Sequence, residues 1–536
     1  MRFKIGFAVI VFAVACVGRG ANWAEKRASA VNRFRPLVYN TDGCDMLYWP
    51  SNLPVSVGNF TGRRLRFALD THISTVSYCP QSAGFGHFTC RKAGEPLTGH
   101  VPHPKGGCYN SATQFFAMGM DSLQMATDFC RTNGLEVFVS IRVNDQHDAL
   151  SRPGKLSALY PSFKIAHPEC LMGSLDAESP RRKELYEGYA GWSCVNFDEK
   201  AVRDRMKGFV RELVTNYDVD GVEYDFNRHF MLFRSVATGG VATKDEISKM
   251  TQLMRDLKSI TEEVGRRKDR PIVIAMRMPD SIGYDLAVGA DIETWFREKL
   301  VDIWIGGGYF LLNQLPDSVA LAHRHGIRFY WSLDESRIPG HAKANGLPVI
   351  EGRMTAPFYA GRYSAAKEAG CDGVYVFNIE NEVLREMTTM DPFDVSGSEK
   401  LYFAVDRGAG GYRPERWLKD GRRFDNLPKI DPGCPLVVPA GGEYAFQMYF
   451  GDDFHGVPAP KVSAIALCSL NSGCVELKVN GKRHVMRQES GGRYSCEVSI
   501  DAIRPGENAF AVRFPDGLSE SVRFNDFAVR VRPRSR

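Results

Sequence analysis

The chain contains no run and no stripe of basic residues, although its formal net charge is +5. Its 68 Lys and Arg are interspersed with 63 Asp and Glu along the whole length. Nucleic-acid-binding domains gather their basic side chains in one segment or on one face. The charge pattern therefore argues against nucleic acid as a partner.

Motifs that bind metals or phosphates through a fixed spacing are also absent. There is no Cys-x-x-Cys pair and no His-x-x-x-His spacing, and no His–Cys cluster suggests a structural zinc site. No Gly-Lys-Ser/Thr sequence follows the glycine run at residues 306–308, which excludes a phosphate loop there. We accordingly expect no metal and no cofactor.

The apolar run at the N-terminus is too short for a membrane span. It reads MRFK followed by IGFAVIVFAVACVG, a short basic region and about a dozen apolar residues, which is typical of a secretory signal. We predict a signal peptide over residues 1–24, no transmembrane segment, and export to the periplasm, the outer membrane or the extracellular space. An alternative cleavage after Ala15 would leave Cys16 first and open to lipid anchoring.

Cysteine number agrees with export. Twelve of the 13 cysteines follow Cys16, and an even number is typical of disulfide pairing in an oxidising compartment. We therefore expect several of the twelve to be paired, with a connectivity that the sequence does not give.

Length and composition predict two domains, since 536 residues with 44% apolar content exceed one ordinary domain. Short β-branched runs, each followed by a loop and a helical pattern, occupy residues 37–42, 74–79, 137–145, 221–226, 272–278, 301–307, 328–334 and 373–378. Eight such units are the number of a closed (β/α)₈ barrel. We place this TIM barrel at residues 34–395.

The alternation of helices and strands stops after residue 390. Residues 396–429 have the composition of a linker, and short alternating strands follow over residues 430–536. The Asn480-Gly481 pair between two such strands is a hairpin signal. We predict a C-terminal β-sandwich, with no aromatic platform clear enough to assign sugar binding to it.

Side-chain alternation along the barrel strands places polar residues on the inward face near the C-terminal ends, where barrel enzymes carry their chemistry. Inward positions by this rule include Ser77, Ser140, Glu223, Asp225, Ser332 and Asp334. Predicted substrate-binding residues at these ends and in the following loops are Asn40, Asp42, Arg142, Asn144, His147, Arg277, Asp280, Glu335, Asn378 and Glu380.

Glu223 and Asp225 are two residues apart, so both should enter the lumen, about 7 Å apart along the strand. Arg142 and Arg277 lie on the two flanking strands and should bracket these carboxylates. Bracketing guanidinium groups would lower the carboxyl pKa values, which favours a nucleophile or an orienting group over a proton donor.

Two carboxyl groups across a cleft, one ionised and one protonated, are what glycosidic cleavage needs. We predict Asp225 as the ionised partner, Glu223 as an orienting group one layer deeper, and Asp334 on the opposite strand as the acid. Glu335 and Glu380 are alternates, because a register error of one residue would exchange faces.

Simpler interpretations exist for each of these charges. The carboxylates and arginines can form an ion-pair ladder that fills the barrel without chemistry. Arg228 and His229 either line the rim of the site or are exposed loop residues. His147 with Asp148 has metal-ligand chemistry, but an ordinary substrate-binding loop is the preferred interpretation.

Four segments carry a family resemblance, namely SIRVNDQHD, DVDGVEYDFNRHF, AMRMPDSIGYDLAVGADIETWFREKLVDIWIGGG and YWSLDES. In these, over residues 30–400 and with a sandwich after the barrel, the chain resembles the family 10-like glycosyl hydrolases, secreted proteins of polysaccharide-degrading bacteria. The resemblance implies a barrel that hydrolyses a poly- or oligosaccharide.

A narrower likeness concerns the chitinase-type motif D-G-x-D-x-D-x-E. Asp220, Gly221, Glu223 and Asp225 match it or nearly match it, but Asn227 stands at the position of the motif's acid. The chitinase mechanism depends on that acid, so this departure argues against it.

A secreted glycoside hydrolase is thus the leading hypothesis. The alternatives are a catalytically inactive carbohydrate-binding barrel, and a polysaccharide lyase or esterase on the same scaffold, because the fold alone does not choose among them. The two arginines are compatible with an anionic sugar, but they are equally explained by pairing with Glu223 and Asp225.

Overall fold

The computed structural model describes residues 22–41, 43–81, 85–101, 106–308, 311–334, 338–377, 381–404, 413–427, 430–456 and 458–533. Cys16 and most of the predicted signal peptide lie outside these ranges. So do four predicted site residues, Asp42, Glu335, Asn378 and Glu380.

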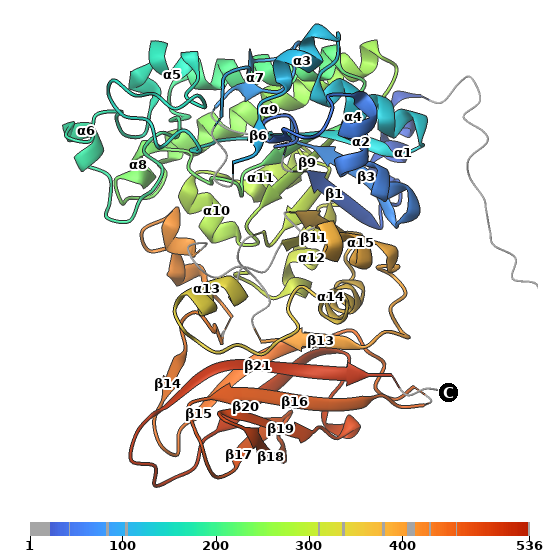
Figure 1. Ribbon diagram of the computed structural model, residues 1–536, viewed down its shortest axis with the longest axis vertical. Coiled ribbons are helices and arrows are strands. Elements are labelled where there is room, and N and C mark those ends of the chain that lie inside the picture. Colours follow the sequence, from blue (N-terminus) through green and yellow to red (C-terminus); the bar gives the residue numbers. More distant parts are fainter. Residues whose placement is uncertain are drawn as a thin grey trace, which may run out of the picture.

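A closed parallel barrel forms the N-terminal part of the described chain (Figure 1). Its strands are β1 (Leu37–Thr41), β3 (Ile73–Tyr78), β7 (Glu136–Arg142), β8 (Gly221–Asp225), β9 (Val273–Met278), β10 (Ile303–Gly306), β11 (Arg328–Asp334) and β12 (Gly373–Phe377). Neighbours along the chain are neighbours in the barrel, and β12 pairs with β1 to close it. Each predicted run overlaps one of these strands, which confirms the (β/α)₈ fold.

Helices surround the barrel. They are α1 (Trp23–Asn32), α2 (Val57–Arg64), α3 (Ala112–Ala117), α4 (Ser122–Thr132), α5 (Ser162–Ala166), α6 (Pro180–Lys183), α7 (Lys200–Asn216), α8 (Arg234–Ala237), α9 (Lys244–Arg267), α10 (Ile282–Val288), α11 (Ile292–Arg297), α12 (Leu315–Arg324), α13 (Ile338–Ala344), α14 (Ala356–Glu368) and α15 (Asn381–Thr389). The longest of these described helices, α9, begins with a capping box in which Thr243 and Glu246 satisfy each other's backbone N–H groups.

Short elements complete the loops. Antiparallel β2 (Trp49–Pro50) and β6 (Cys108–Tyr109) pair with each other, as do parallel β4 (His87–Phe88) and β5 (Glu95–Pro96). The 3₁₀ turns are η1 (Arg66–Asp70), η2 (Pro168–Cys170), η3 (Pro414–Arg416), η4 (Gly421–Phe424) and η5 (Ile500–Ala502).

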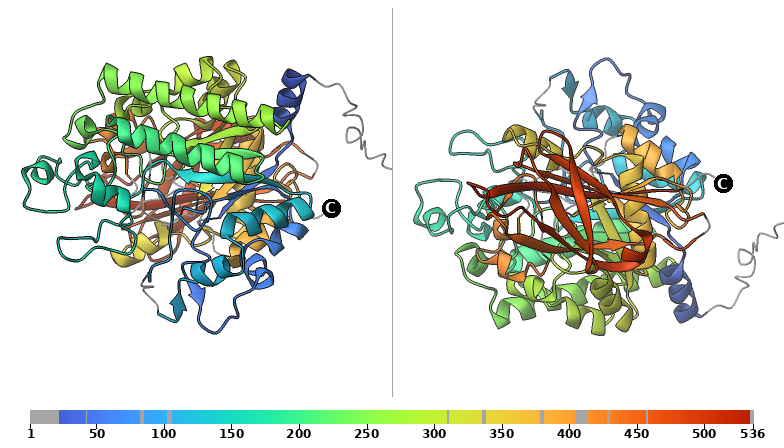
Figure 2. Two further views of the ribbon diagram at one scale, coloured as in Figure 1. Left: turned by 90° about the horizontal axis from the view of Figure 1, so that it is seen from above. Right: turned by 90° about the horizontal axis from the view of Figure 1, so that it is seen from below.

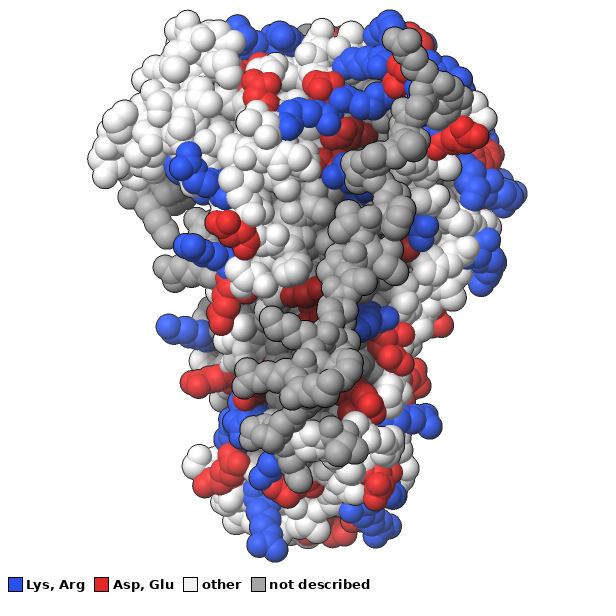
Figure 3. All heavy atoms as spheres, turned by 90° about the vertical axis from the view of Figure 1, so that its right-hand side faces the viewer, with Lys and Arg blue, Asp and Glu red and all other residues white. Residues whose placement is uncertain are grey.

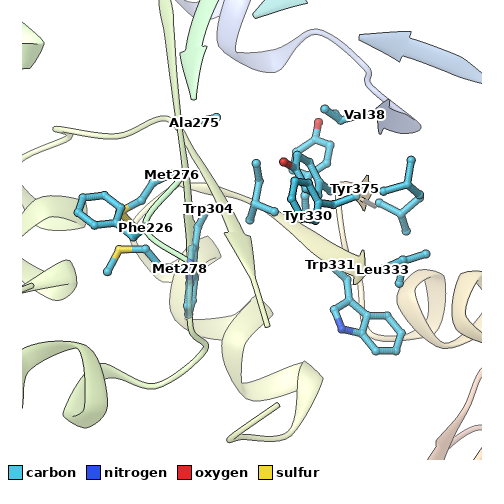
Figure 4. Packing of buried hydrophobic residues seen from close by; sticks show 14 of the residues in the cluster. Val38, Phe226, Ala275, Met276, Met278, Trp304, Tyr330, Trp331, Leu333 and Tyr375 are labelled. Carbon is cyan, nitrogen blue, oxygen red and sulfur yellow. The ribbon is translucent and has the colours of Figure 1, made fainter. Parts of the chain in front are cut away.

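The alternation of the strands separates two apolar layers. Val38 pairs with Tyr375, and Figure 4 shows Tyr375 and Tyr330 together beside Val38, away from Phe226, Met276 and Met278. The tyrosines fill the lumen, whereas the second group packs toward the helices, as the period of two requires.

The N-terminal end of the barrel is closed by charges that are fully paired. Arg35 donates to Glu136 at 2.6 and 2.7 Å, and Thr75 donates to the same carboxylate at 2.8 Å. Asp220 accepts from Arg131 and from the backbone N–H of Val137, so it fixes the turn before β8. These residues stabilise the end of the barrel that lies away from the site.

The C-terminal part is one antiparallel sheet. Its strands are β13 (Lys400–Phe403), β14 (Leu436–Val438), β15 (Glu443–Phe450), β16 (Lys461–Cys468), β17 (Val475–Val479), β18 (Lys482–Ser490), β19 (Arg493–Glu497), β20 (Gly506–Arg513) and β21 (Val522–Arg532). β18 pairs with β17 on one side and β19 on the other. Phe527 of β21 packs against Phe446 and Phe510 of β15 and β20, so two halves of the sheet face each other as a sandwich.

The hairpin expected at Asn480-Gly481 is present. It joins β17 to β18, and both residues have positive φ, 47° and 85°. That conformation is the one a two-residue type I′ turn requires, and it explains the choice of Asn and Gly.

The sandwich lies across one side of the barrel (Figure 2). Residues 400–403, inside the segment expected to be a linker, form β13 and pair with β21. Arg353 of the barrel donates to Asp526 of β21 at 2.7 and 2.8 Å, with both side chains fully buried. One continuous apolar core runs through both parts.

The structure contains no disulfide within the described residues, which include all twelve cysteines after Cys16. The expected pairing is therefore not found. An even number says nothing of geometry, and a disulfide needs two Cα atoms about 4.4–6.8 Å apart. Several of these thiols are instead core side chains, and burial raises the pKa of Cys130 to about 12.

Two surface properties bear on the predicted partners. Basic and acidic side chains are interspersed on the face shown in Figure 3. No helix in the described ranges combines the length and the apolar character needed to cross a bilayer.

Candidate active site

Glu223 lies at the centre of the barrel, fully buried, and its carboxyl group accepts four hydrogen bonds from neutral side chains. Asn40, Ser140 and Tyr375 donate to Oε1 at 3.1, 2.9 and 2.9 Å. Ser77 donates to Oε2 at 2.6 Å. Donors from β1, β3, β7 and β12 therefore converge on one residue of β8.

Burial raises the pKa of Glu223 to about 7, and the negative charge of Asp225 contributes in the same direction. The four hydrogen bonds and Arg277 only partly offset this. The sequence-based expectation of a lowered pKa is wrong for Glu223, because burial and the charge of Asp225 outweigh the lowering effect of Arg277. Near neutral pH this carboxyl group is close to half protonated.

One layer nearer the mouth of the barrel, Arg277 joins two carboxylates. Its Nη1 donates to Oδ1 of Asp225 at 3.0 Å and its Nη2 to Oδ1 of Asp334 at 2.9 Å. The backbone N–H of Arg228 also donates to Asp225, and the Ser332 hydroxyl donates to Asp334. The structure thus brings Asp225 and Asp334 together one layer above Glu223, the third residue that we predicted as catalytic, and each aspartate is 2% exposed.

β12 presents Tyr375 and Phe377 to the lumen. Tyr375 reaches Glu223, and the Arg277 guanidinium lies 4.2 Å from the ring centre of Phe377. The sequence-based register placed Asn378 and Glu380 on the inward face of this strand. In the described part of β12, residues 373, 375 and 377 face the lumen instead. Both expected residues lie outside the described ranges.

The rim of the mouth carries a second group around Asp145. Arg142 donates to Oδ2 of Asp145 at 3.1 Å, and Nδ1 of His147 lies 2.9 Å from the same oxygen. Burial alone would raise the pKa of Asp145, but His147 and Arg142 hold it well below its ordinary range. Within the described residues Arg142 pairs with Asp145, so the predicted bracket around Glu223 and Asp225 consists of Arg277 alone.

His147 also contacts the loop that follows β8. Nη2 of Arg228 lies 3.1 Å from its Nε2, and its ring meets that of His229 edge-on at 5.2 Å. His229 is 7% exposed, so it is a buried rim residue. Asp148, considered with His147 as a metal ligand, instead forms a buried ion pair with Lys164 at 2.5 Å.

Two residues predicted to bind substrate, Asn144 and Asp280, instead form hydrogen bonds to the backbone of neighbouring loops. Asn144 donates to the carbonyls of Val195 and Met231 at 2.8 and 2.6 Å, and so ties two loops together. Asp280 accepts from the backbone N–H groups of Leu312 and Asn313. Asp280 also lines a surface cavity of about 430 Å³ beside α10, α12 and η4.

Asn227, at the position of the acid in the chitinase-type motif, is buried against Gly308. A side chain at Gly308 would meet the Asn227 amide at 1.8 Å. Gly308, two residues after the end of β10, thus allows the loops after β8 and β10 to approach each other.

Sequence reasoning missed Asp145, Tyr375 and Phe377. Asp145 directly follows Asn144 and was available as a carboxylate at the end of a strand. Tyr375 and Phe377 alternate with valines in GVYVF. Assigning Val374 and Val376 to the outer face of the barrel would have predicted that Tyr375 and Phe377 face the lumen.

The arrangement can hold a proton and a negative charge within one narrow lumen. Arg277 stabilises negative charge on its partners, while buried Glu223 retains a proton up to near-neutral pH. Two groups of described residues have ligand atoms close enough to share a metal ion, namely Asp145 with His147 and His229, and His167 with Glu169 and Cys170.

No model of a known protein family matches the sequence, and no curated protein matches it. Similar solved structures include the PgaB (BpsB) glycoside hydrolase domain from Bordetella bronchiseptica, at TM-score 0.41 and 11% identity, covering 67% of this chain and 99% of that one. A glycoside hydrolase family 18 N-acetylglucosaminidase from Paenibacillus barengoltzii has TM-score 0.36 and 11% identity, with coverages of 66% and 100%. An α-amylase from Malbranchea cinnamomea has TM-score 0.36 and 10% identity, with coverages of 91% and 97%.

These scores and identities assign no activity to the chain. None of the three is described as a family 10-like protein, and that resemblance remains a prediction.

Proposed function

We propose that the chain is an exported glycoside hydrolase that cleaves glycosidic bonds of a poly- or oligosaccharide. The observation that carries the proposal is the bridge of Arg277 between Asp225 and Asp334 at the mouth of the barrel. These carboxylates come from β8 and β11, which β9 and β10 separate in the barrel. They therefore face a common lumen from different sides.

The spacing of the pair suits the reaction. One guanidinium group spans both acids, so their bonded oxygens lie at most about 8 Å apart, which does not exceed the widest separation of paired carboxyl groups in glycoside hydrolases. This bound includes both the retaining and the inverting separations, so the stereochemical outcome stays open.

Asp225 is the ionised partner in the proposal. Two N–H donors converge on its Oδ1, from Arg277 and from the backbone of Arg228. Hydrogen bonds to a carboxylate favour its charged form and restrict its rotation. A fixed carboxylate at the mouth can act as a nucleophile or as a base toward water.

Asp334 is the proposed acid. Its Oδ1 is satisfied by Arg277 and Ser332, whereas its buried Oδ2 has no hydrogen-bond partner among the described residues. An unsatisfied carboxyl oxygen can carry the proton that the leaving oxygen needs, whereas the hydrogen bond from Arg277 favours the charged form of Asp334 and counts against this role. Glu223, enclosed by four donors, orients the layer above it and does not reach substrate directly.

A catalytically inactive carbohydrate-binding barrel is the second candidate. It is favoured by Asn227 at the acid position of the chitinase-type motif and by the near-complete burial of Asp225 and Asp334. A polysaccharide lyase or esterase on the same scaffold is the remaining alternative.

Export is part of the proposal and rests on the N-terminal pattern of residues 1–24. A lipid anchor at Cys16 belongs to the same hypothesis. Mass spectrometry of the mature N-terminus from a native-like host tests both, since cleavage and acylation give different masses.

The deciding experiment is a screen of the purified chain against a panel of neutral and anionic polysaccharides, with reducing ends and unsaturated products measured together. New reducing ends without unsaturation support hydrolysis. Unsaturated products indicate a lyase, released acyl groups an esterase, and binding without turnover the inactive barrel.

A further inference from the structure

The cluster of Asp145, His147 and His229 lies at the barrel rim, outside the Asp225–Asp334 pair. We propose that it binds one divalent transition-metal ion through a carboxylate oxygen of Asp145 and Nδ1 of each histidine. The proposal departs from the expectation of no metal, which considered sequence spacing alone, and it does not depend on glycosidase activity.

The ligand atoms already converge. All three lie within 4.8 Å of one another. Nδ1 of His147 is 2.9 Å from Oδ2 of Asp145, and Nδ1 of His229 is 3.8 Å from the same oxygen. The histidines come from the loops after β7 and β8, so the fold and not the spacing creates the group.

His229 gives the second, independent indication. Its side chain is more than nine-tenths buried, and its Nδ1, which points toward Asp145, has no hydrogen-bond partner among the described residues. A buried polar atom without a partner costs free energy. A metal ion between Nδ1 and the carboxylate would supply the missing partner.

Arg142 is placed to support the site. It donates to Asp145 at 3.1 Å, which holds the carboxylate in position as outer partners of metal ligands do.

Arg228 opposes metal binding in the arrangement described. A guanidinium only donates, so its contact with Nε2 of His147 places the imidazole proton on Nδ1. A metal at Nδ1 must displace that proton to Nε2, where it would face the Arg228 donor. Arg228 therefore has to turn away when the ion binds, and it weakens the affinity.

The ligand set selects the class of ion. Two imidazoles and one carboxylate suit Zn²⁺, Co²⁺ or Ni²⁺, whereas Mg²⁺ and Ca²⁺ prefer oxygen ligands. Three protein ligands leave at least one position open. His147 is 34% exposed in its side chain, so that position is accessible to water or to a hydroxyl group of a bound molecule.

The other candidate cluster provides a matched control. His167 and Glu169 lie 3.0 Å apart, with side chains that are 43% and 60% exposed. An exposed pair with water as an alternative partner lacks the burial that distinguishes the rim cluster.

The test uses the full chain, stripped with EDTA and dialysed. Titration with Co²⁺ should give visible d–d bands that saturate at one equivalent, and calorimetry with Zn²⁺ should give the same stoichiometry. His229→Gln and His147→Gln should each weaken binding at least about tenfold. His167→Gln should leave it unchanged, and thermal unfolding without metal verifies that each variant is folded.

Arg228→Met gives the sharper test, because it removes the opposing donor and keeps the aliphatic stem. It should tighten Zn²⁺ binding several-fold. Absence of saturable binding, loss of binding in His167→Gln, or weaker binding in Arg228→Met would each overturn the proposal. Because His147 is partly exposed, His147→Gln stays decisive if His229→Gln does not fold. These readouts involve no carbohydrate, so failure here and failure of the proposed activity are distinguishable.

Discussion

Glu223 is the residue in which burial outweighs hydrogen bonding. Four donors stabilise its charge, yet its pKa is raised to about 7 from an ordinary value of 4.5. The folded state therefore binds a proton that the unfolded state releases between these two values. The same side chain that organises the site makes stability depend on pH.

The direction in which stability changes with pH follows from the linkage between proton binding and folding. Below about pH 4.5 both states are protonated and the stabilisation from this group is complete, and it is lost as the pH rises through about 7. The loss is on the order of 3 kcal/mol. Glu223→Gln should remove this pH-dependent contribution. The difference in unfolding free energy between the variant and the parent should therefore shift in favour of the variant as the pH rises from 5 to 8.5. Urea unfolding at both values measures this, with exposed Glu386→Gln as a control that should show no such trend.

A parallel pH dependence in Glu223→Gln and the parent would mean that this carboxyl does not titrate near neutrality in the folded chain.

Asp225→Asn tests the proposed chemistry. The replacement is nearly isosteric and still accepts from Arg277 and Arg228, so folding and substrate binding should persist. Turnover should fall by at least about 100-fold, because an amide acts neither as a nucleophile nor as a base. Exposed Asp128→Asn is the control. Near-parental turnover in Asp225→Asn would contradict the catalytic role and indicate that these carboxylates form structural ion pairs.

Asp334→Asn should lower turnover similarly on ordinary substrates. A proposed acid is dispensable when the leaving group needs little protonation, so aryl glycosides with good leaving groups should recover much of the rate. Equal loss on both kinds of substrate would contradict the role of Asp334 as the acid.

At the scale of elements, the strands follow from local sequence and the site follows from how they meet. β8 places Glu223 and Asp225 on one face by alternation alone, but the donors to Glu223 come from β1, β3, β7 and β12. The hairpin between β17 and β18 is the opposite case, because a two-residue signal decides the local backbone completely.

That hairpin gives a local prediction. Gly481 has φ 85° and no atom within 4 Å of an added Cβ, so Gly481→Ala should cost about 1 kcal/mol through the backbone alone. Gly62→Ala, also without neighbours within 4 Å but in α2, should be neutral or stabilising. Thermal unfolding of the two variants compares them, and equal effects would show that the turn conformation is not the cause.

For the whole molecule, a buried ion pair joins barrel to sandwich. Arg353 and Asp526 form two hydrogen bonds, and the Arg353 guanidinium also lies 3.8 Å from the ring centre of Phe403. With the continuous apolar core, this pair makes the sandwich part of the barrel's stability.

Asp526→Ala should therefore destabilise the chain by about 3–5 kcal/mol, because it leaves a buried guanidinium without its counter-charge. The double variant Arg353→Met/Asp526→Leu should recover most of that loss. Glu497→Ala, which breaks an exposed pair with Lys461, should change stability by less than about 1 kcal/mol. Urea unfolding measures all three, and a small effect of Asp526→Ala would argue against the buried pair.

The sequence alone determined the barrel, the sandwich, the hairpin and the inward face of β8. These depend on hydrophobic periodicity and turn residues, which act over a few positions along the chain. Asp225, Arg277 and Asp334 followed from the same rule, since parallel strands bring their C-terminal ends together.

The tertiary structure decided the partners and the charges. Arg142 pairs with Asp145 and not with Glu223, β12 turns Tyr375 and Phe377 inward, and His147 meets His229 across two loops. The raised pKa of Glu223 depends on complete burial beside Asp225, and several of the cysteines have core positions without disulfides. Distances between loops and the water excluded from a lumen are set by packing of the whole chain, so no local pattern encodes them.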